Sequence, residues 1–142
     1  MSIGLQAIHV TLRGGGGPEP TGDAFFRLLG LTNATGLRLH ASDSTWRWAT
    51  AQLFAVNMDD VKDAEEPTEA FAERVQEGFD SAALLLVRCK IQGLAEWRAR
   101  GKEADVFVGG WLANEQFDLK IPAPFLVQCA RLGLSISICT ND

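Results

Sequence analysis

Several residue types on which catalytic and metal sites depend are scarce in this sequence of 142 residues. Tyrosine is absent, and only two histidines, His9 and His40, occur. A closed zinc site needs four ligands, and neither histidine has a cysteine within motif distance. A nucleophile–base grouping of His40 with Asp43 and a nearby serine depends on a geometry that spacing does not dictate. A surface turn is the commoner use of such residues. We therefore expect no metal site and single out no catalytic residue.

Cysteine is also rare, and its three positions, Cys89, Cys129 and Cys139, show no paired spacing. Their odd number argues against a disulfide framework, and Cys89 and Cys129 lie in apolar helical stretches, which predicts buried, reduced thiols. The longest strictly apolar run, 82–87, is far too short to span a bilayer. With no signal-peptide pattern at the N-terminus, we expect a soluble, cytoplasmic protein with no membrane partner.

Glycine is plentiful after the first apolar segment, but the residues that bind phosphate are missing there. Phosphate-binding loops between strand and helix need fixed glycine spacing, and one class of them needs a lysine. Glu19 stands where the dinucleotide fingerprint has its third glycine, and Asp23 stands where the phosphate loop has its lysine. We therefore predict an irregular turn over residues 13–20 and expect no nucleotide or other cofactor.

Negative charge predominates, since 18 acidic side chains face 13 basic ones and give a formal net charge of −5. Phosphate backbones repel such a chain, so nucleic acid is not an expected partner. Residues 59–80 are mainly acidic and residues 88–102 mainly basic. The carboxylates of the acidic segment are Asp59, Asp60, Asp63, Glu65, Glu66, Glu69, Glu73, Glu77 and Asp80. Two interpretations stay open: the two segments are solvated faces that attract each other, or the acidic one docks a basic protein.

Hydrophobic periodicity predicts the element order β-α-β-α-β-β-α-β. The predicted strands cover residues 8–12, 46–56, 106–108, 117–121 and 134–139, and the predicted helical segments cover 21–29, 68–100 and 122–132. Periodicity does not decide whether residues 68–100 form one helix or two, and a polar loop is expected through His40 and Asp43. Apolar and polar residues alternate along the strands, which predicts one solvent-exposed sheet face and helices packed on the other. We predict a single α+β domain over residues 1–142. It should have two layers, with a mixed or antiparallel sheet of about five strands and helices packed on one face.

Tryptophan is the remaining candidate for recognition. Indoles dominate interface hot spots, although packing in a core is their commoner use. Stacking of nucleic-acid bases on Trp46 and Trp48 is disfavoured by the acidic balance of the chain. The candidate binding residues are Trp46, Trp48, Trp111, Glu69, Glu73 and Glu77.

Several segments resemble those of a known bacterial family. They are 99–101, 104–111, 116–119, 125–126 and 132–138, together with 26–32 near the N-terminus. The family is the uncharacterised domain of unknown function 4279. Its members have a similar length, a helix that ends before a strand with a glycine-aromatic step, and a terminal helix followed by a Leu-Gly-Leu strand. Residues 33–36 depart from the family pattern because they lack its proline. The resemblance implies a fold and transfers no activity, cofactor or catalytic residue.

These patterns predict a non-enzymatic binding or interaction domain rather than an enzyme. In its sharpest form the protein is an immunity-type domain that neutralises a basic protein toxin through the acidic segment. The alternative is a small-molecule-binding protein or enzyme with a site near His40, Asp43, Trp46 and Trp111. A homodimer joined through an exposed sheet edge is a third alternative.

Overall fold

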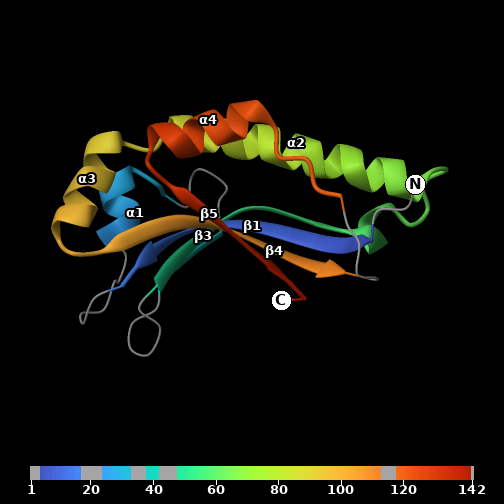
Figure 1. Cartoon of the computed structure of the whole chain (residues 1–142), viewed down its shortest axis with the longest axis horizontal. Helices are drawn as coiled ribbons and strands as arrows, with labels where there is room; N and C mark the ends of the chain where they lie inside the picture. The colour runs from blue at the N-terminus through green and yellow to red at the C-terminus, as the bar shows by residue number, and fades with distance from the viewer. Residues whose placement is uncertain (1–3, 17–23, 33–37, 42–47, 113–117, 142) are drawn as a thin grey trace.

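The structure, a computed structural model, describes residues 4–16, 24–32, 38–41, 48–112 and 118–141. Its elements are β1 (Leu5–Gly15), α1 (Ala24–Leu29), β2 (Arg38–Ala41), β3 (Trp48–Asn57), the 3-10 turn η2 (Met58–Val61), α2 (Pro67–Val87), α3 (Ile91–Ala99), β4 (Glu103–Leu112), α4 (Ala123–Arg131) and β5 (Ser135–Thr140). They form two layers, with the helices above one face of a sheet of order β2-β3-β1-β4-β5 (Figure 1). The predicted α+β class and mixed sheet are confirmed.

The pairing of the strands explains why the helices lie in one layer. Strand β1 is central and antiparallel to both β3 and β4, so β3 and β4 run in the same direction. Strand β5 is parallel to β4. Strands that run in the same direction need long crossover connections, which are usually helical. Here α2 and α3 connect β3 to β4, and α4 connects β4 to β5. In Figure 1 these crossovers share one face, and none of the described helices lies on the opposite face.

The predicted order of elements is wrong at two strands. Residues 118–122 form no strand, although Leu119 and Ile121 alternate with polar residues, and Phe117 lies outside the described residues. Both side chains pack against the core from a loop, and the Lys120 carbonyl accepts a hydrogen bond of 2.8 Å from the Gln76 side chain instead of joining a ladder. Strand β2 replaces part of the expected polar loop. Its four residues are too few to show an alternation.

Residues 68–100 form two helices, α2 and α3, and the break lies at residues 88–90 rather than at Gly78. Gly78 stays inside α2 because the Phe54 ring packs against it, where an added Cβ would lie 2.3 Å from a ring carbon. Gly101 and Gly133 end α3 and α4 with φ of +78° and +66°, the left-handed conformation that favours glycine after a helix.

Strand β1 extends into the glycine run, so the predicted turn from Arg13 is wrong for its first residues. Gly14 pairs with Ala49 on one side and Ala104 on the other. The Phe25 ring lies directly against this glycine, where a Cβ would be 2.3 Å from the ring. Close packing of an aromatic ring on bare backbone therefore holds this part of the run in the sheet. Residues 17–23 lie outside the described part of the chain.

Aromatic side chains fill the space between the layers. Phe79 of α2 contacts Phe54 of β3 and Phe125 of α4, with ring centroids 4.9 and 5.0 Å apart. Phe25 and Trp97 join α1 to α3 at 5.0 Å. Cys89 and Cys129 are buried, as predicted, while Cys139 is exposed. None of the described helices is long and apolar enough to cross a bilayer.

Candidate functional site

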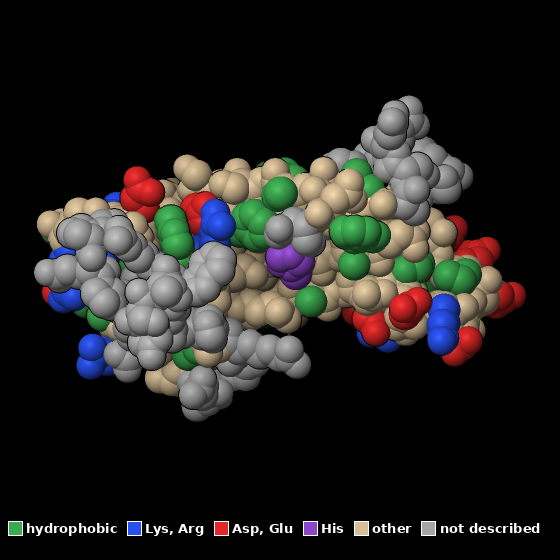
Figure 2. All heavy atoms as spheres, turned by 90° about the horizontal axis from the view of Figure 1, so that it is seen from below, with side chains coloured by type: hydrophobic (Ala, Val, Ile, Leu, Met, Phe, Trp, Pro, Cys, Tyr) green, Lys and Arg blue, Asp and Glu red, His purple; other side chains and the backbone are tan. Residues whose placement is uncertain are grey.

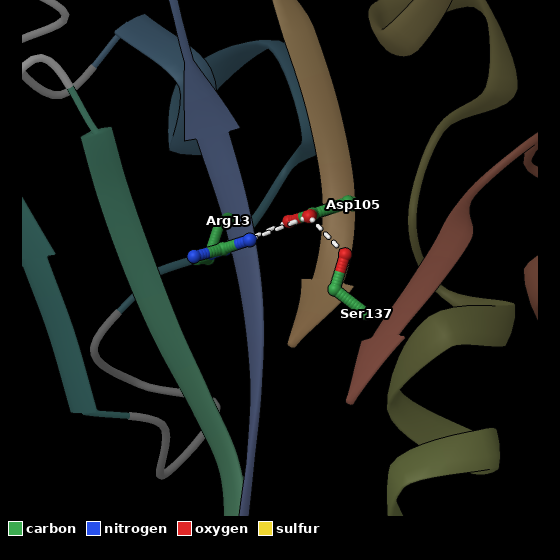
Figure 3. A network of polar contacts seen from close by, with 3 residues as sticks. All are labelled: Arg13, Asp105 and Ser137. Atoms are coloured by element: carbon green, nitrogen blue, oxygen red, sulfur yellow. Dashed lines mark hydrogen bonds and ion pairs between the residues drawn. The ribbon is translucent and has the colours of Figure 1, made fainter. Parts of the chain in front are cut away.

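The uncovered face of the sheet carries a polar cluster centred on Arg13 (Figure 3). Register places Arg13 between Thr50 of β3 and Asp105 of β4. Its Nε donates to Asp105 Oδ1 at 2.8 Å and its Nη2 donates to Oδ2 at 2.6 Å. Ser137 Oγ of β5 donates to the same Oδ2 at 3.2 Å. The two charged side chains are 28% and 17% exposed, so the cluster joins three strands in a partly buried setting.

Two aromatic rings complete the surroundings of Arg13. The guanidinium carbon lies 5.2 Å from the ring centroid of Trp48 and 4.5 Å from that of Phe107. Both distances are within the range of cation–π attraction. No sequence pattern predicts this cluster, because Arg13 opens a glycine run and Asp105 lies 92 positions further along the chain. Its contacts are mutual, which is typical of a cluster that stabilises the sheet.

His9 lies on the same face, four residues before Arg13 on β1. Its ring packs 5.7 Å from that of Phe107 and lies directly over Gly109, where an added Cβ would be 2.1 Å from Nε2. Figure 2 shows this face, with a histidine in its middle and hydrophobic side chains beside it. Within the described residues, no group of three or more His, Cys, Asp or Glu side chains is placed to hold a metal ion.

The predicted tryptophan residues do not form one site. Trp48, at the start of β3, is half-buried beside Arg13. Trp111, near the end of β4, is 55% exposed. Their partners on β1 are Gly15 and Ala7, eight residues apart, which corresponds to roughly 26 Å along the strand. Trp46 lies outside the described residues.

The predicted small-molecule site is not assembled either. His40 of the edge strand β2 pairs with Thr50, which pairs with Arg13 on β1, whereas Trp111 pairs with Ala7. The two rows are six residues apart on β1, roughly 20 Å, and β2 and β4 are not neighbours in the sheet. Strand order therefore places His40 and Trp111 in different rows of the sheet. Asp43 and Trp46, the other members of that site, lie outside the described residues.

Two of the larger cavities among the described residues open at the surface. One, of about 380 Å³, lies beside Trp48 and contains the cations Arg98 and Lys102 as well as the carboxylates of Glu103 and Asp105. The cations already donate to main-chain carbonyls. Arg98 Nη2 donates to the carbonyls of residues 132 and 133 at 2.8 and 2.9 Å, and Lys102 Nζ donates to that of residue 16 at 3.1 Å. The charges of this cavity therefore do not define an anion site.

The second cavity, of about 260 Å³, lies between the start of β1 and α2. Its lining includes the apolar side chains of Leu5, Phe71 and Val75, with Asp118 and Lys120 of opposite charge among its polar groups. It lies apart from the Arg13 cluster, because its lining shares no residue with that cluster. Neither cavity therefore selects a ligand of one charge.

The candidate residues Glu69, Glu73 and Glu77 do come together, and we call them the acidic face of α2. Each stands two residues before a buried one (Phe71, Val75 and Phe79), which places it on the outward side of the helix, about 200° around from the core. All three are exposed. Among the described residues, none of the three carboxylates takes part in an ion pair. The pKa of Glu69 is raised by a hydrogen bond with Glu66, by partial loss of hydration and by the charge of Glu73.

Three cations of the basic segment 88–102 have contacts away from the acidic face. Arg100 pairs with Glu96 of its own helix at 3.1 Å, and Arg98 and Lys102 bond to main-chain carbonyls. Within the described part of the chain, these three cations therefore do not neutralise the acidic face. Both interpretations of the charge pattern, mutual attraction of the two segments and docking of a basic protein, stay open.

Fold and surface together define a class, a two-layer α+β domain with an uncovered sheet face and an acidic outer helix. No family model, curated protein or solved structure matches this chain. The resemblance to the domain of unknown function 4279 therefore stays a prediction.

Proposed function

We propose that this protein is a non-enzymatic binding domain that captures a basic protein through the acidic face of α2. The observation that carries the proposal is the set of three exposed carboxylates without an ion-pair partner in the described structure. In its narrowest form, the partner is a basic toxin that this chain neutralises by occupying it.

Repulsion among the carboxylates of the acidic face lowers the stability of α2 when no partner is bound. Like charges four residues apart destabilise a helix by about 0.2–0.5 kcal/mol per pair. The helix dipole favours acids only near the first turn, which contains Glu69 but neither Glu73 nor Glu77. A basic partner would remove this repulsion and would be steered toward the face by long-range attraction. The attraction between the partner and the acidic face should therefore be strongest at low ionic strength.

The test compares three forms of the chain as bait for basic proteins at rising salt concentration. The reversal variant is Glu69→Lys/Glu73→Lys/Glu77→Lys. The control variant, Glu96→Lys/Glu103→Lys/Asp118→Lys, changes net charge equally at exposed positions outside α2. We expect the unmodified chain and the control to retain one common basic protein, and the reversal variant to bind it at least about tenfold more weakly with a shallower salt dependence. Equal affinity of all three forms would refute the proposal.

A further inference from the structure

Strand β5 forms one edge of the sheet and has no device that keeps other strands away. It ends the strand order of the described sheet and pairs with β4 on one side. Five of its six residues are exposed, and the sixth, Ile136, is half-buried. Natural sheets blunt exposed edges with charged residues, proline, bulges or very short strands. Ser135–Thr140 contains no charge and no proline, and its pairing with β4 is regular.

The unpaired backbone groups of this edge can be assigned. The N–H of Asn141 donates to the carbonyl of Gly110 on β4, which places the residues with odd numbers toward β4. Because backbone direction alternates along a strand, Ile136, Ile138 and Thr140 point their N–H and C=O groups away from the sheet. The edge therefore presents three donors and three acceptors in a regular row.

Apolar side chains accompany this row on the helical side of the sheet. Ile138 pairs with the buried Val108 and is itself 54% exposed. Leu126 of α4 is 43% exposed. It lies about 140° around the helix from Arg131, whose Nη2 donates to the Leu86 carbonyl of α2. Since α2 packs on β3 and α4 on β5, Leu126 faces the β5 edge.

We infer that two copies of this chain join through β5, edge to edge and antiparallel, around a two-fold axis at Ile138. Ile138 then lies opposite Ile138 of the second copy, and Ile136 lies opposite Thr140. Each of these pairs consists of residues whose backbone groups point outward, so the three pairs exchange about six hydrogen bonds. A two-fold contact of this kind closes on itself and uses up both edges, which stops further growth.

A second copy fits this edge better than a charged partner does. The chain has a net charge of −5, so two copies repel each other over most of their surfaces. Strand β5 contains no charged residue, so the seam, the line along which the two β5 strands meet, carries no charge from this strand. Its alternating β-branched residues favour strand pairing with an identical segment. The acidic face lies on α2, which packs on β3, and two strands separate β3 from β5. Repulsion at the seam is therefore weak.

The inferred register makes a specific prediction on the uncovered face. Ser137 lies opposite Cys139 of the second copy, as a pair without mutual hydrogen bonds, whose Cβ atoms are about 4.5–5.5 Å apart. A Ser137→Cys variant should therefore form a disulfide between subunits with Cys139 under mild oxidation. Ser135→Cys is the matched control, because residue 135 lies opposite residue 141, which is an asparagine.

Sedimentation analysis of the full chain under reducing conditions, over a wide micromolar range, tests the dimer itself. We expect a mass of twice 15.4 kDa for the unmodified chain and 15.4 kDa for Ile138→Lys, which places two like charges opposite each other. Leu84→Lys, at a 69% exposed position on α2, should stay dimeric, and circular dichroism should show both variants folded. A monomeric unmodified chain, a chain that forms larger assemblies, or a dimeric Ile138→Lys overturns the inference. Equal cross-linking of the two cysteine variants overturns the register.

Discussion

Replacing Asp105 with asparagine keeps the size of the side chain and removes the carboxylate that accepts hydrogen bonds of 2.8 and 2.6 Å from Arg13. The amide can accept at one position only, so it loses the bidentate geometry and the charge. Arg13 then remains between the rings of Trp48 and Phe107. Only 28% of its side chain is exposed, so water can replace the lost partner only in part.

The size of the effect follows from this partial burial. Exposed ion pairs contribute about 0.2–1 kcal/mol, whereas removal of one partner from a fully buried pair costs about 3–5 kcal/mol. With exposures of 28% and 17%, the Arg13–Asp105 pair falls between the two cases, and we expect a loss of about 2 kcal/mol in the free energy of unfolding. For a chain of this length, that corresponds to a Tm lower by about 6–8 °C.

Urea unfolding followed by tryptophan fluorescence measures the loss directly, with Glu96→Gln as the control. That variant removes the partner of Arg100 in a pair whose side chains are 47% and 57% exposed. Its expected cost is about 0.3–0.5 kcal/mol, and salt should reduce it more strongly because exposed charges are better screened. If Asp105→Asn costs no more than Glu96→Gln, the cluster on the uncovered face does not stabilise the sheet.

Two further predictions concern packing. Gly93→Ala places a Cβ 1.9 Å from a main-chain carbonyl oxygen of α1 and should cost about 2–3 kcal/mol in urea unfolding. Gly101 has open space around it, so Gly101→Ala is strained only by its φ of +78° and should cost about 1–2 kcal/mol. If Gly101→Ala destabilised the protein more than Gly93→Ala, the packing argument would be contradicted. Burial raises the pKa of both Cys89 and Cys129 to about 11, so a thiol reagent at neutral to mildly alkaline pH should label Cys139 rapidly and the other two only on unfolding. Labelling of all three at one rate in the folded protein would be inconsistent with that burial.

Local patterns predicted the parts of the fold in which neighbours along the chain share one environment. Phe71, Val75 and Phe79 follow one another at four-residue intervals, the period of a helix, and all three are buried. The acidic face follows from the same period, because each glutamate stands two residues before a buried side chain. In a helix, side chains four residues apart lie on one face, so the spacing of the glutamates in the sequence predicts a shared surface. This also explains why the glutamates were the candidate binding residues that the structure brings together.

The remaining features depend on partners distant in sequence. Arg13 reads as the start of a glycine turn, and only pairing with β3 and β4 turns it into the centre of a sheet face. Leu119 and Ile121 alternate like a strand, but they are partly buried against the core from a loop, which the same period also permits. His40 and Trp111 were grouped by residue type, and strand order separated them. Strand order is a property of the whole chain, and no short window of sequence contains it.

The two proposed surfaces can act together because they lie on different parts of the domain. The sheet places β1 and β4 between β3, which supports α2, and the β5 edge. Pairing through β5 would therefore leave both acidic faces of a dimer open, and each dimer could hold two basic partners. Charge reversal on α2 should weaken binding at least about tenfold without changing the mass. Ile138→Lys should halve the mass and leave the affinity of one acidic face for one partner unchanged. On a surface coated with partner, a dimer can bind through both acidic faces at once, which raises the effective concentration of the second face. The monomeric Ile138→Lys variant should therefore dissociate from such a surface faster than the unmodified chain. A loss of affinity in solution on Ile138→Lys would mean instead that the partner binds across the β5 seam.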